Sequence, residues 1–124
     1  MTKYEIYLPL KYNDGTGIEP EKLEEIQQQL IAVFGAMTVS SLSAPFQGTW
    51  TYGGVEFVDD IIRIEIITKA DLISNHFLKN FKRQLKRKLR QFDILITVQD
   101  IHTIWATKAP KCTYEINLEF YISS

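Results

Sequence analysis

The sequence predicts a single α+β domain of ferredoxin-like fold, with a βαββαβ antiparallel sheet, both helices on one face, and an extra C-terminal strand. Two observations carry this prediction. Apolar residues alternate with period two in several segments, which is typical of strands, and recur every three or four residues in two others, which is typical of helices. The 124 residues are 45% hydrophobic and 23% charged, which excludes wholesale disorder.

The first strand and the first helix have clear boundaries. Residues 4–10 alternate as a strand, and residues 12–17 (Tyr-Asn-Asp-Gly-Thr-Gly) have the composition of a turn. Pro20 then stands where a helix begins, and Gly35 stands where it ends. We therefore expect a helix over residues 20–34, with its apolar stripe on one side.

The middle of the chain is less regular. We expect a short strand over about residues 37–42 and a long strand over 61–68, where isoleucines alternate. Residues 43–60 lie between them and are long for a hairpin connection. Within this stretch, residues 48–52 and 55–58 can pair across the Gly53-Gly54 turn.

A second helix and two more strands follow. Either Asp71 or Ser74 can cap the helix, which we expect to run to about Gln91. A strand is predicted from residue 94 to about 105. The clean alternation over 114–122 predicts the C-terminal strand, at about 113–122, outside a domain core of about 3–105.

Both faces of the predicted sheet have apolar positions. The helices cover one face, and the other face needs a cover of its own. Its apolar positions are Tyr7, Ile61, Ile67, Leu95 and Ile101. We therefore predict a homo-oligomer, assembled through the sheet or through the C-terminal strand, which can extend a sheet edge of its own or of a neighbouring chain.

The predicted topology brings three connections to one end of the sheet, at residues 12–19, 43–60 and 90–93. Loops held by rigid elements are where binding residues concentrate. The candidate ligand-binding residues at this end are Tyr12, Asn13, Asp14, Trp50 and Tyr52. The alternative is that these loops only close the core, with Trp50 packed beneath them.

Charge is distributed unevenly. The net charge is −1, yet residues 79–90 hold seven basic side chains and no acid, which leaves −8 on the rest of the chain. Such a face is a candidate site for nucleic acid, another anionic partner or an anionic membrane surface. The alternative is a solvated face neutralised by Glu21, Glu24 or Glu25 opposite Lys82 or Lys86. The anion-binding candidates are Lys79, Lys82, Arg83, Lys86, Arg87 and Arg90.

Recognised catalytic motifs are missing from the sequence. There is no phosphate-binding loop, dinucleotide fingerprint or nucleophile elbow. Asp100, His102 and Cys112 can be written as a catalytic set but have no known local signature. Asp14, Asp59 and Asp60 can meet as ligands for a hard cation, at a spacing that is not specific. We expect neither a metal nor a cofactor, and we favour a protein that is not an enzyme.

The single cysteine, Cys112, cannot form an intramolecular disulfide, which fits a reducing compartment. The first residues lack the apolar core of a secretory signal, and no apolar run reaches the roughly 18 residues that a membrane span needs. These observations predict a cytoplasmic protein without a membrane span.

The segment Leu8-Pro9-Leu10-Lys11-Tyr12-Asn13-Asp14-Gly15, followed by Pro20-Glu21-Lys22, resembles a motif of a group of small uncharacterised bacterial proteins. Phe34-Gly35-Ala36-Met37-Thr38 and Gly48-Thr49-Trp50 are similar to two further motifs of that group, which has a second glycine where this chain has Ala36. The resemblance covers about residues 4–104 and supports the fold and the loop positions without supplying an activity.

The function that the sequence favours is a small, non-enzymatic binding or assembly module. The first alternative is nucleic-acid or other anion binding through the basic segment 79–90. The second is a small enzyme with a pocket at the loop end, around Tyr12, Asp14 and Trp50.

Overall fold

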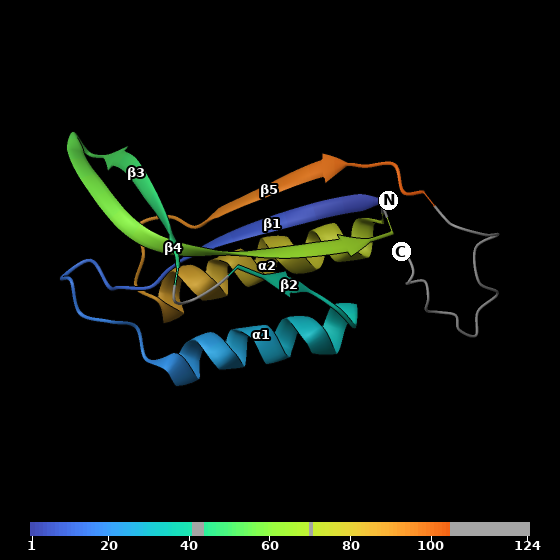
Figure 1. Cartoon of the computed structure of the whole chain (residues 1–124), viewed down its shortest axis with the longest axis horizontal. Coiled ribbons are helices and arrows are strands. Elements are labelled where there is room, and N and C mark those ends of the chain that lie inside the picture. The colour runs from blue at the N-terminus through green and yellow to red at the C-terminus, as the bar shows by residue number, and fades with distance from the viewer. Residues whose placement is uncertain (41–43, 70, 105–124) are drawn as a thin grey trace.

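The computed structural model describes residues 1–40, 44–69 and 71–104 (Figure 1). Within these residues the chain forms two helices and five strands. In chain order they are β1 (Thr2–Pro9), α1 (Pro20–Phe34), β2 (Thr38–Val39), β3 (Phe46–Tyr52), β4 (Val55–Thr68), α2 (Leu72–Lys88) and β5 (Leu95–Asp100).

The strands form one antiparallel sheet in the order β2-β4-β1-β5, and β3 pairs with the first half of β4. Both helices lie on the same side of this sheet (Figure 1). The order is the predicted βαββαβ with one added strand, β3, between the helices, and the antiparallel pairing and the single helix layer confirm the predicted ferredoxin-like fold. Residues 113–122, predicted as an additional C-terminal strand, lie outside the described residues.

The core lies between the sheet and the helices. Ile6 of β1 pairs with Ile64 of β4, and both side chains are completely buried. Their neighbours two residues away face the same side, as the period of a strand requires. Burying one such aliphatic side chain contributes about 1.5–3 kcal/mol to the stability of the fold. The other buried residues of this face are Tyr4, Leu8, Ile62 and Ile66.

Helix α1 has the predicted bounds, Pro20–Phe34, and its ends show why. Pro20 occupies the first turn, where its missing N–H removes no helical hydrogen bond. Gly35 ends the helix in a left-handed conformation, with φ of 82°, and donates its N–H to the carbonyl of Ile31. The two residue types that signalled the ends in the sequence therefore form the ends of the helix.

Helix α2 begins as predicted and ends earlier. Asp71 caps it by accepting a hydrogen bond of 2.6 Å from the Ser74 N–H. The helix ends at Lys88, three residues before the predicted Gln91, because Arg90 is left-handed with φ of 50°. The N–H of Arg90 donates a hydrogen bond to the carbonyl of Arg87, and the N–H of Gln91 donates one to the carbonyl of Lys86. This pattern is a Schellman motif with arginine where glycine is usual.

The stretch between β2 and the core of β4 is more regular than predicted. The hairpin across Gly53-Gly54 is confirmed, with Trp50 opposite Phe57, and it extends over the whole of β3. Strand β4 is continuous from Val55 to Thr68, so the predicted irregular stretch ends before Phe46. The hairpin projects past the end of β1 and curves away from the helix layer (Figure 1). Within the predicted strand 37–42, β2 comprises Thr38–Val39, and residues 41 and 42 lie outside the described residues.

Strand β5 ends at Asp100, whereas the sequence predicted a strand to about residue 105. Its partner β1 begins at Thr2, which pairs with Asp100, so residues beyond Asp100 have no further β1 residue to pair with. Ile101 still donates one hydrogen bond to the Met1 carbonyl.

The face of the sheet away from the helices, here called the open face, is mixed in character. Ile67 and Leu95 are 51% and 58% exposed on it, which agrees with the predicted apolar positions. Its centre is polar, because charged residues of β1 and β4 line up there, which the apolar pattern alone does not reveal. These charged residues are Lys3, Glu5, Arg63 and Glu65.

Glu5 organises the polar centre of the open face. Its carboxylate accepts hydrogen bonds of 3.1 Å from the Tyr7 and Thr97 hydroxyls and lies 3.6 Å from the Lys3 ammonium and 3.8 Å from the Arg63 guanidinium. Burial raises the pKa of the Glu5 carboxyl, but these hydrogen bonds and charges outweigh burial and hold the pKa below its ordinary value.

Candidate functional site

The three connections that the topology was expected to bring together do meet at one end of the molecule. The β1–α1 loop, the β3–β4 hairpin and the turn between α2 and β5 all lie at the left of Figure 1. Asn13 of the first connection donates a hydrogen bond of 3.2 Å to the carbonyl of Arg90 in the third. Gln91 donates one of 3.4 Å to the carbonyl of Lys11.

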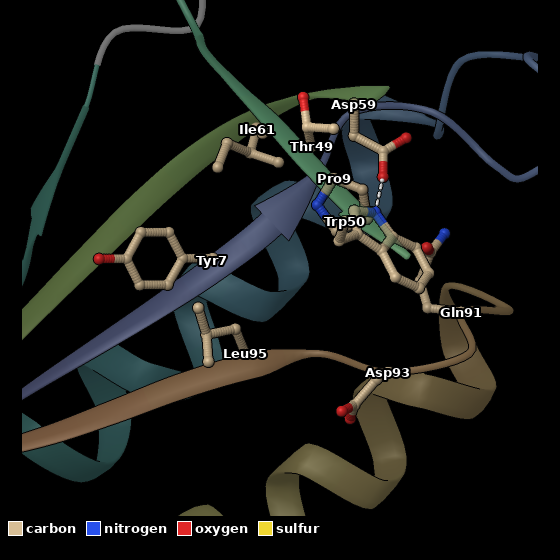
Figure 2. A pocket seen from close by; sticks show the side chains of 10 residues that line it. Tyr7, Pro9, Thr49, Trp50, Asp59, Ile61, Gln91, Asp93 and Leu95 are labelled. Atoms are coloured by element: carbon tan, nitrogen blue, oxygen red, sulfur yellow. Dashed lines mark hydrogen bonds between the residues drawn. The ribbon is translucent and has the colours of Figure 1, made fainter. Parts of the chain in front are cut away.

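A pocket of about 470 Å³ lies at this end, on the open face of the sheet (Figure 2). Strands β1, β4 and β5 form its floor, the curved hairpin forms one wall, and the α2–β5 turn forms another. Its size is within the range of natural ligand pockets, about 300–1,000 Å³. The lining residues are Tyr7, Pro9, Gly48, Thr49, Trp50, Asp59, Ile61, Gln91, Asp93 and Leu95.

Aromatic packing holds the hairpin wall in place. The indole of Trp50 is stacked on Phe57 of the paired strand, with ring centroids 4.7 Å apart. It also meets Phe92 of the α2–β5 turn edge to face, at 6.3 Å. Offset-stacked and edge-to-face pairs of this kind contribute about 0.5–1.5 kcal/mol each beyond the area that they bury. The hairpin and the turn are therefore joined by side chains directly beside the pocket.

The polar groups of the pocket are held by protein contacts. Asp59 accepts a hydrogen bond of 2.7 Å from the indole N–H of Trp50, which Figure 2 shows as a dashed line. Asp93 accepts one of 2.8 Å from the Ile94 N–H and lies 3.3 Å from the ammonium of Lys82. Burial raises the pKa of the Asp93 carboxyl, but these two contacts outweigh burial, so the pKa lies below its ordinary value.

The predicted ligand-binding residues divide into three groups. Trp50 lines the pocket. Tyr52 lies next to it along β3 and stacks on Phe92, with centroids 4.7 Å apart, outside the pocket lining. Tyr12, Asn13 and Asp14 lie in a separate cluster around Arg90, in the β1–α1 loop. The structure therefore brings these residues to one end of the molecule without bringing them into one site.

Tyr12 is the centre of the separate cluster. It is 6% exposed, its hydroxyl donates to Glu19 and accepts 2.7 Å from the ammonium of Lys22, and the Arg90 guanidinium lies 4.4 Å from its ring centroid. The Tyr12 hydroxyl lowers the pKa of Glu19 and raises that of Lys22. The polar atoms of this cluster bind one another rather than facing a ligand. The cluster therefore holds the β1–α1 loop against the C-terminal end of α2.

Asp14 is engaged within its own turn. Its Oδ1 accepts hydrogen bonds from the Thr16 hydroxyl, at 2.7 Å, and from the Thr16 N–H, at 2.9 Å. These bonds hold the pKa of the Asp14 carboxyl below its ordinary value. This is the arrangement of an Asx turn, which fixes loop geometry.

The basic segment is partly neutralised. Lys82 and Lys86 lie 3.3 and 4.0 Å from Asp93, and Lys88 pairs with Glu25 of α1. The predicted partner of Lys82 and Lys86, a glutamate of α1, is therefore replaced by Asp93 just beyond the helix. Among the described residues Lys79, Arg83 and Arg87 form no ion pair, and Arg90 lies over Tyr12.

Of the two other sequence alternatives, the structure tests the cation site and leaves the catalytic set as a prediction. Within residues 1–40, 44–69 and 71–104, no three His, Cys, Asp or Glu side chains are grouped as metal ligands, so Asp14, Asp59 and Asp60 do not meet. Cys112, one member of the possible catalytic set with His102 and Asp100, lies outside the described residues. In the part of the chain that the structure describes, no helix is long and apolar enough to cross a membrane.

Most of the pocket residues were missed as site residues in the sequence. Tyr7, Ile61 and Leu95 were noted only as apolar positions of the uncovered face, and Gln91 and Asp93 were assigned to the end of a helix and a connection. The available signal was the coincidence of an apolar open face with the end at which the loops gather. It required placing β1, β4 and β5 side by side, which local patterns alone do not do.

Comparisons with known proteins support the fold. No protein-family model and no curated protein matches the chain in sequence. Among solved structures, a phage SAM lyase in complex with S-methyl-5′-thioadenosine is similar with a TM-score of 0.60 at 13% identity, covering 80% of each chain.

Two further structures share the fold. The divalent cation tolerance protein CutA1 from Thermus thermophilus has a TM-score of 0.55 at 13% identity, over 83% of this chain and 86% of that one. The PII-like protein CutA from Nostoc sp. PCC 7120 has a TM-score of 0.51 at 15% identity, over 82% and 81%. Likenesses at this level of identity show the architecture and leave the function to the site.

Proposed function

We propose that this chain is a binding module that holds a small organic molecule in the pocket on its open face, and that a second copy of the chain covers that face. The observation that carries the proposal is the pocket itself. It combines an apolar floor, with Ile61, Leu95 and Pro9, and a few fixed polar groups, which is the composition of natural small-molecule sites.

The engagement of the polar lining groups favours binding over turnover. Asp59 is held by Trp50, and Asp93 is held by Lys82 and by the Ile94 N–H. The side-chain amide of Gln91 donates hydrogen bonds to the carbonyls of Leu89 and Lys11. Groups fixed in this way preserve the shape of a pocket and orient a ligand within it.

The exposure of the pocket favours a second copy as its cover. Leu95 in the lining is 58% exposed, and Ile67 at the other end of the open face is 51% exposed. Natural pockets bury most of a ligand's surface, which this pocket cannot do alone. The open face carries both signs of charge, with Lys3 and Arg63 beside Glu5 and Glu65, and such a surface can be complementary to itself.

The comparisons add support without supplying a ligand. A protein of the same fold, the phage SAM lyase, binds S-methyl-5′-thioadenosine in its solved structure. This shows that the architecture can accommodate a small organic molecule. At 13% identity it does not transfer that molecule, or lyase activity, to this chain.

Ligand-observed NMR with a panel of small aromatic and heteroaromatic fragments, S-methyl-5′-thioadenosine included, tests the binding proposal. Leu95→Arg should block the mouth of the pocket. Val98→Arg is the matched control, since Val98 lies on the same strand, is similarly exposed at 57%, and does not line the pocket. We expect fragments that bind the wild type and Val98→Arg but not Leu95→Arg. Absence of any hit, or equal binding by both variants, would refute the proposal.

Size-exclusion chromatography with light scattering tests the assembly proposal separately. We expect a mass of at least two chains at micromolar concentration, reduced by Ile67→Lys, which puts a charge on the apolar end of the open face. A monomer at that concentration would remove the second copy from the proposal.

A further inference from the structure

The lining of the pocket carries charge of one sign. Among its ten residues, two are aspartates and none is lysine, arginine or histidine. The two carboxylates come from different elements, Asp59 from β4 and Asp93 from the α2–β5 turn, and they lie on different walls of the same pocket (Figure 2). A ligand in this pocket therefore meets carboxylates from two directions.

The two carboxylates differ in how far the protein already compensates them. Asp93 lies within 4.0 Å of both Lys82 and Lys86, whose ammonium groups offset its charge. Asp59 is half-buried, and its Oδ2 accepts the indole N–H of Trp50, a neutral donor. Among the residues that the structure describes, Asp59 forms no ion pair. Asp59 thus has an uncompensated charge beside an aromatic ring.

The rest of the pocket suits a flat, positively charged group. Trp50 and Tyr7 both line it, and aromatic rings attract cations through their electron-rich faces. Phosphates and carboxylates are recognised by basic side chains and helix N-termini, and this lining has neither.

We propose that the pocket selects a small flat cation, such as an aryl amidinium or another delocalised cation, with Asp59 as its counter-charge and the rings of Trp50 and Tyr7 as its apolar contacts. This inference rests on the proposed function, because it names the class of ligand for the same pocket. It also excludes nucleoside phosphates as preferred ligands.

The test compares three probes of nearly equal size and shape that differ in charge: benzamidinium, benzamide and benzoate. Dissociation constants from NMR titration are measured for the wild type, Asp59→Asn and Asp60→Asn. Asparagine at position 59 removes the charge and keeps an oxygen acceptor for the Trp50 N–H. Asp60→Asn is the matched control, because it makes the same change one residue away and Asp60 does not line the pocket.

We expect benzamidinium to bind the wild type about five- to tenfold more tightly than benzamide, because one partly exposed charge pair beside an aromatic ring strengthens binding by about that factor. We expect benzoate to bind most weakly. Asp59→Asn should remove the difference between benzamidinium and benzamide, and Asp60→Asn should keep it. Equal affinities for the three probes, a preference for benzoate, no binding by any of them, or an unchanged preference in Asp59→Asn would overturn the inference. The fragment panel with Leu95→Arg still decides separately whether the pocket binds at all.

Discussion

Arg90 offers a sharp test of the structure at the end that carries the pocket. It adopts φ of 50°, in the left-handed region, at the position of the Schellman motif that glycine usually fills. A left-handed residue with a Cβ costs about 1–2 kcal/mol relative to the right-handed form, and glycine avoids that cost. The greater freedom of glycine in the unfolded chain offsets about 0.4–1 kcal/mol of the gain.

We therefore expect Arg90→Gly to be more stable than Arg90→Ala by roughly 0.5–1 kcal/mol. Both variants lose the guanidinium that lies 4.4 Å from the Tyr12 ring centroid, so the comparison isolates the backbone. In urea unfolding followed by circular dichroism, with a slope of about 2 kcal/mol per molar, the two midpoints should differ by roughly 0.25–0.5 M.

The control is the same pair of substitutions at Lys79, an exposed position inside α2. At this position the alanine variant should have a free energy of unfolding about 1 kcal/mol higher than the glycine variant. The order of stability of the two variants therefore inverts between positions 79 and 90. If Arg90→Ala were more stable than Arg90→Gly, residue 90 would not be left-handed. The turn that places Gln91 and Asp93 in the pocket would then be wrong as well.

Two further predictions concern titration and capping. The hydrogen bonds and charges around Glu5 hold the pKa of its carboxyl below the value in the unfolded chain. The contribution of Glu5 to folding stability is therefore complete above the unfolded pKa and is lost as pH falls through the folded pKa. Glu5→Gln should therefore reduce the loss of stability between about pH 5 and pH 3, measured by urea unfolding, and an unchanged pH dependence would contradict this. Asp71→Ala should lower the urea midpoint more than Asp71→Asn, because asparagine can still accept from the Ser74 N–H; equal midpoints would show that the cap does not stabilise α2.

The sequence was sufficient for elements whose ends are marked by particular residue types. Pro20 and Gly35 bound α1, and both the expected and the observed helix run from residue 20 to 34. The end of α2 was placed three residues too late, because the left-handed residue there is arginine and only glycine would have signalled it. The strand pattern over residues 46–60 was obscured by polar residues, since the hairpin projects beyond the helix layer and has no fully buried face there.

Most of the pocket's lining could not be predicted because its chemistry depends on pairings between distant segments. Asp93 reads in the sequence as an isolated loop acid, and only the structure places it against Lys82 and Lys86. The same contact changes the interpretation of the basic helix, since part of its charge is already used within the chain. The candidate residues Tyr12 and Asp14 were chosen because their loop lies at the end where the connections gather, and the structure shows that their polar atoms are engaged locally.

The proposals for the pocket and for the second copy are linked, because both concern the open face. If a second copy covers the pocket and adds contacts to the ligand, the ligand must strengthen association by the same factor by which association strengthens ligand binding. Ile67→Lys separates the two effects, since Ile67 lies on the open face but does not line the pocket. The variant should weaken association and, through the linkage, also weaken the binding of any ligand that the pocket holds. Weakened association with unchanged affinity would mean that the pocket binds its ligand within a single chain, and that the second copy adds no contact to the ligand.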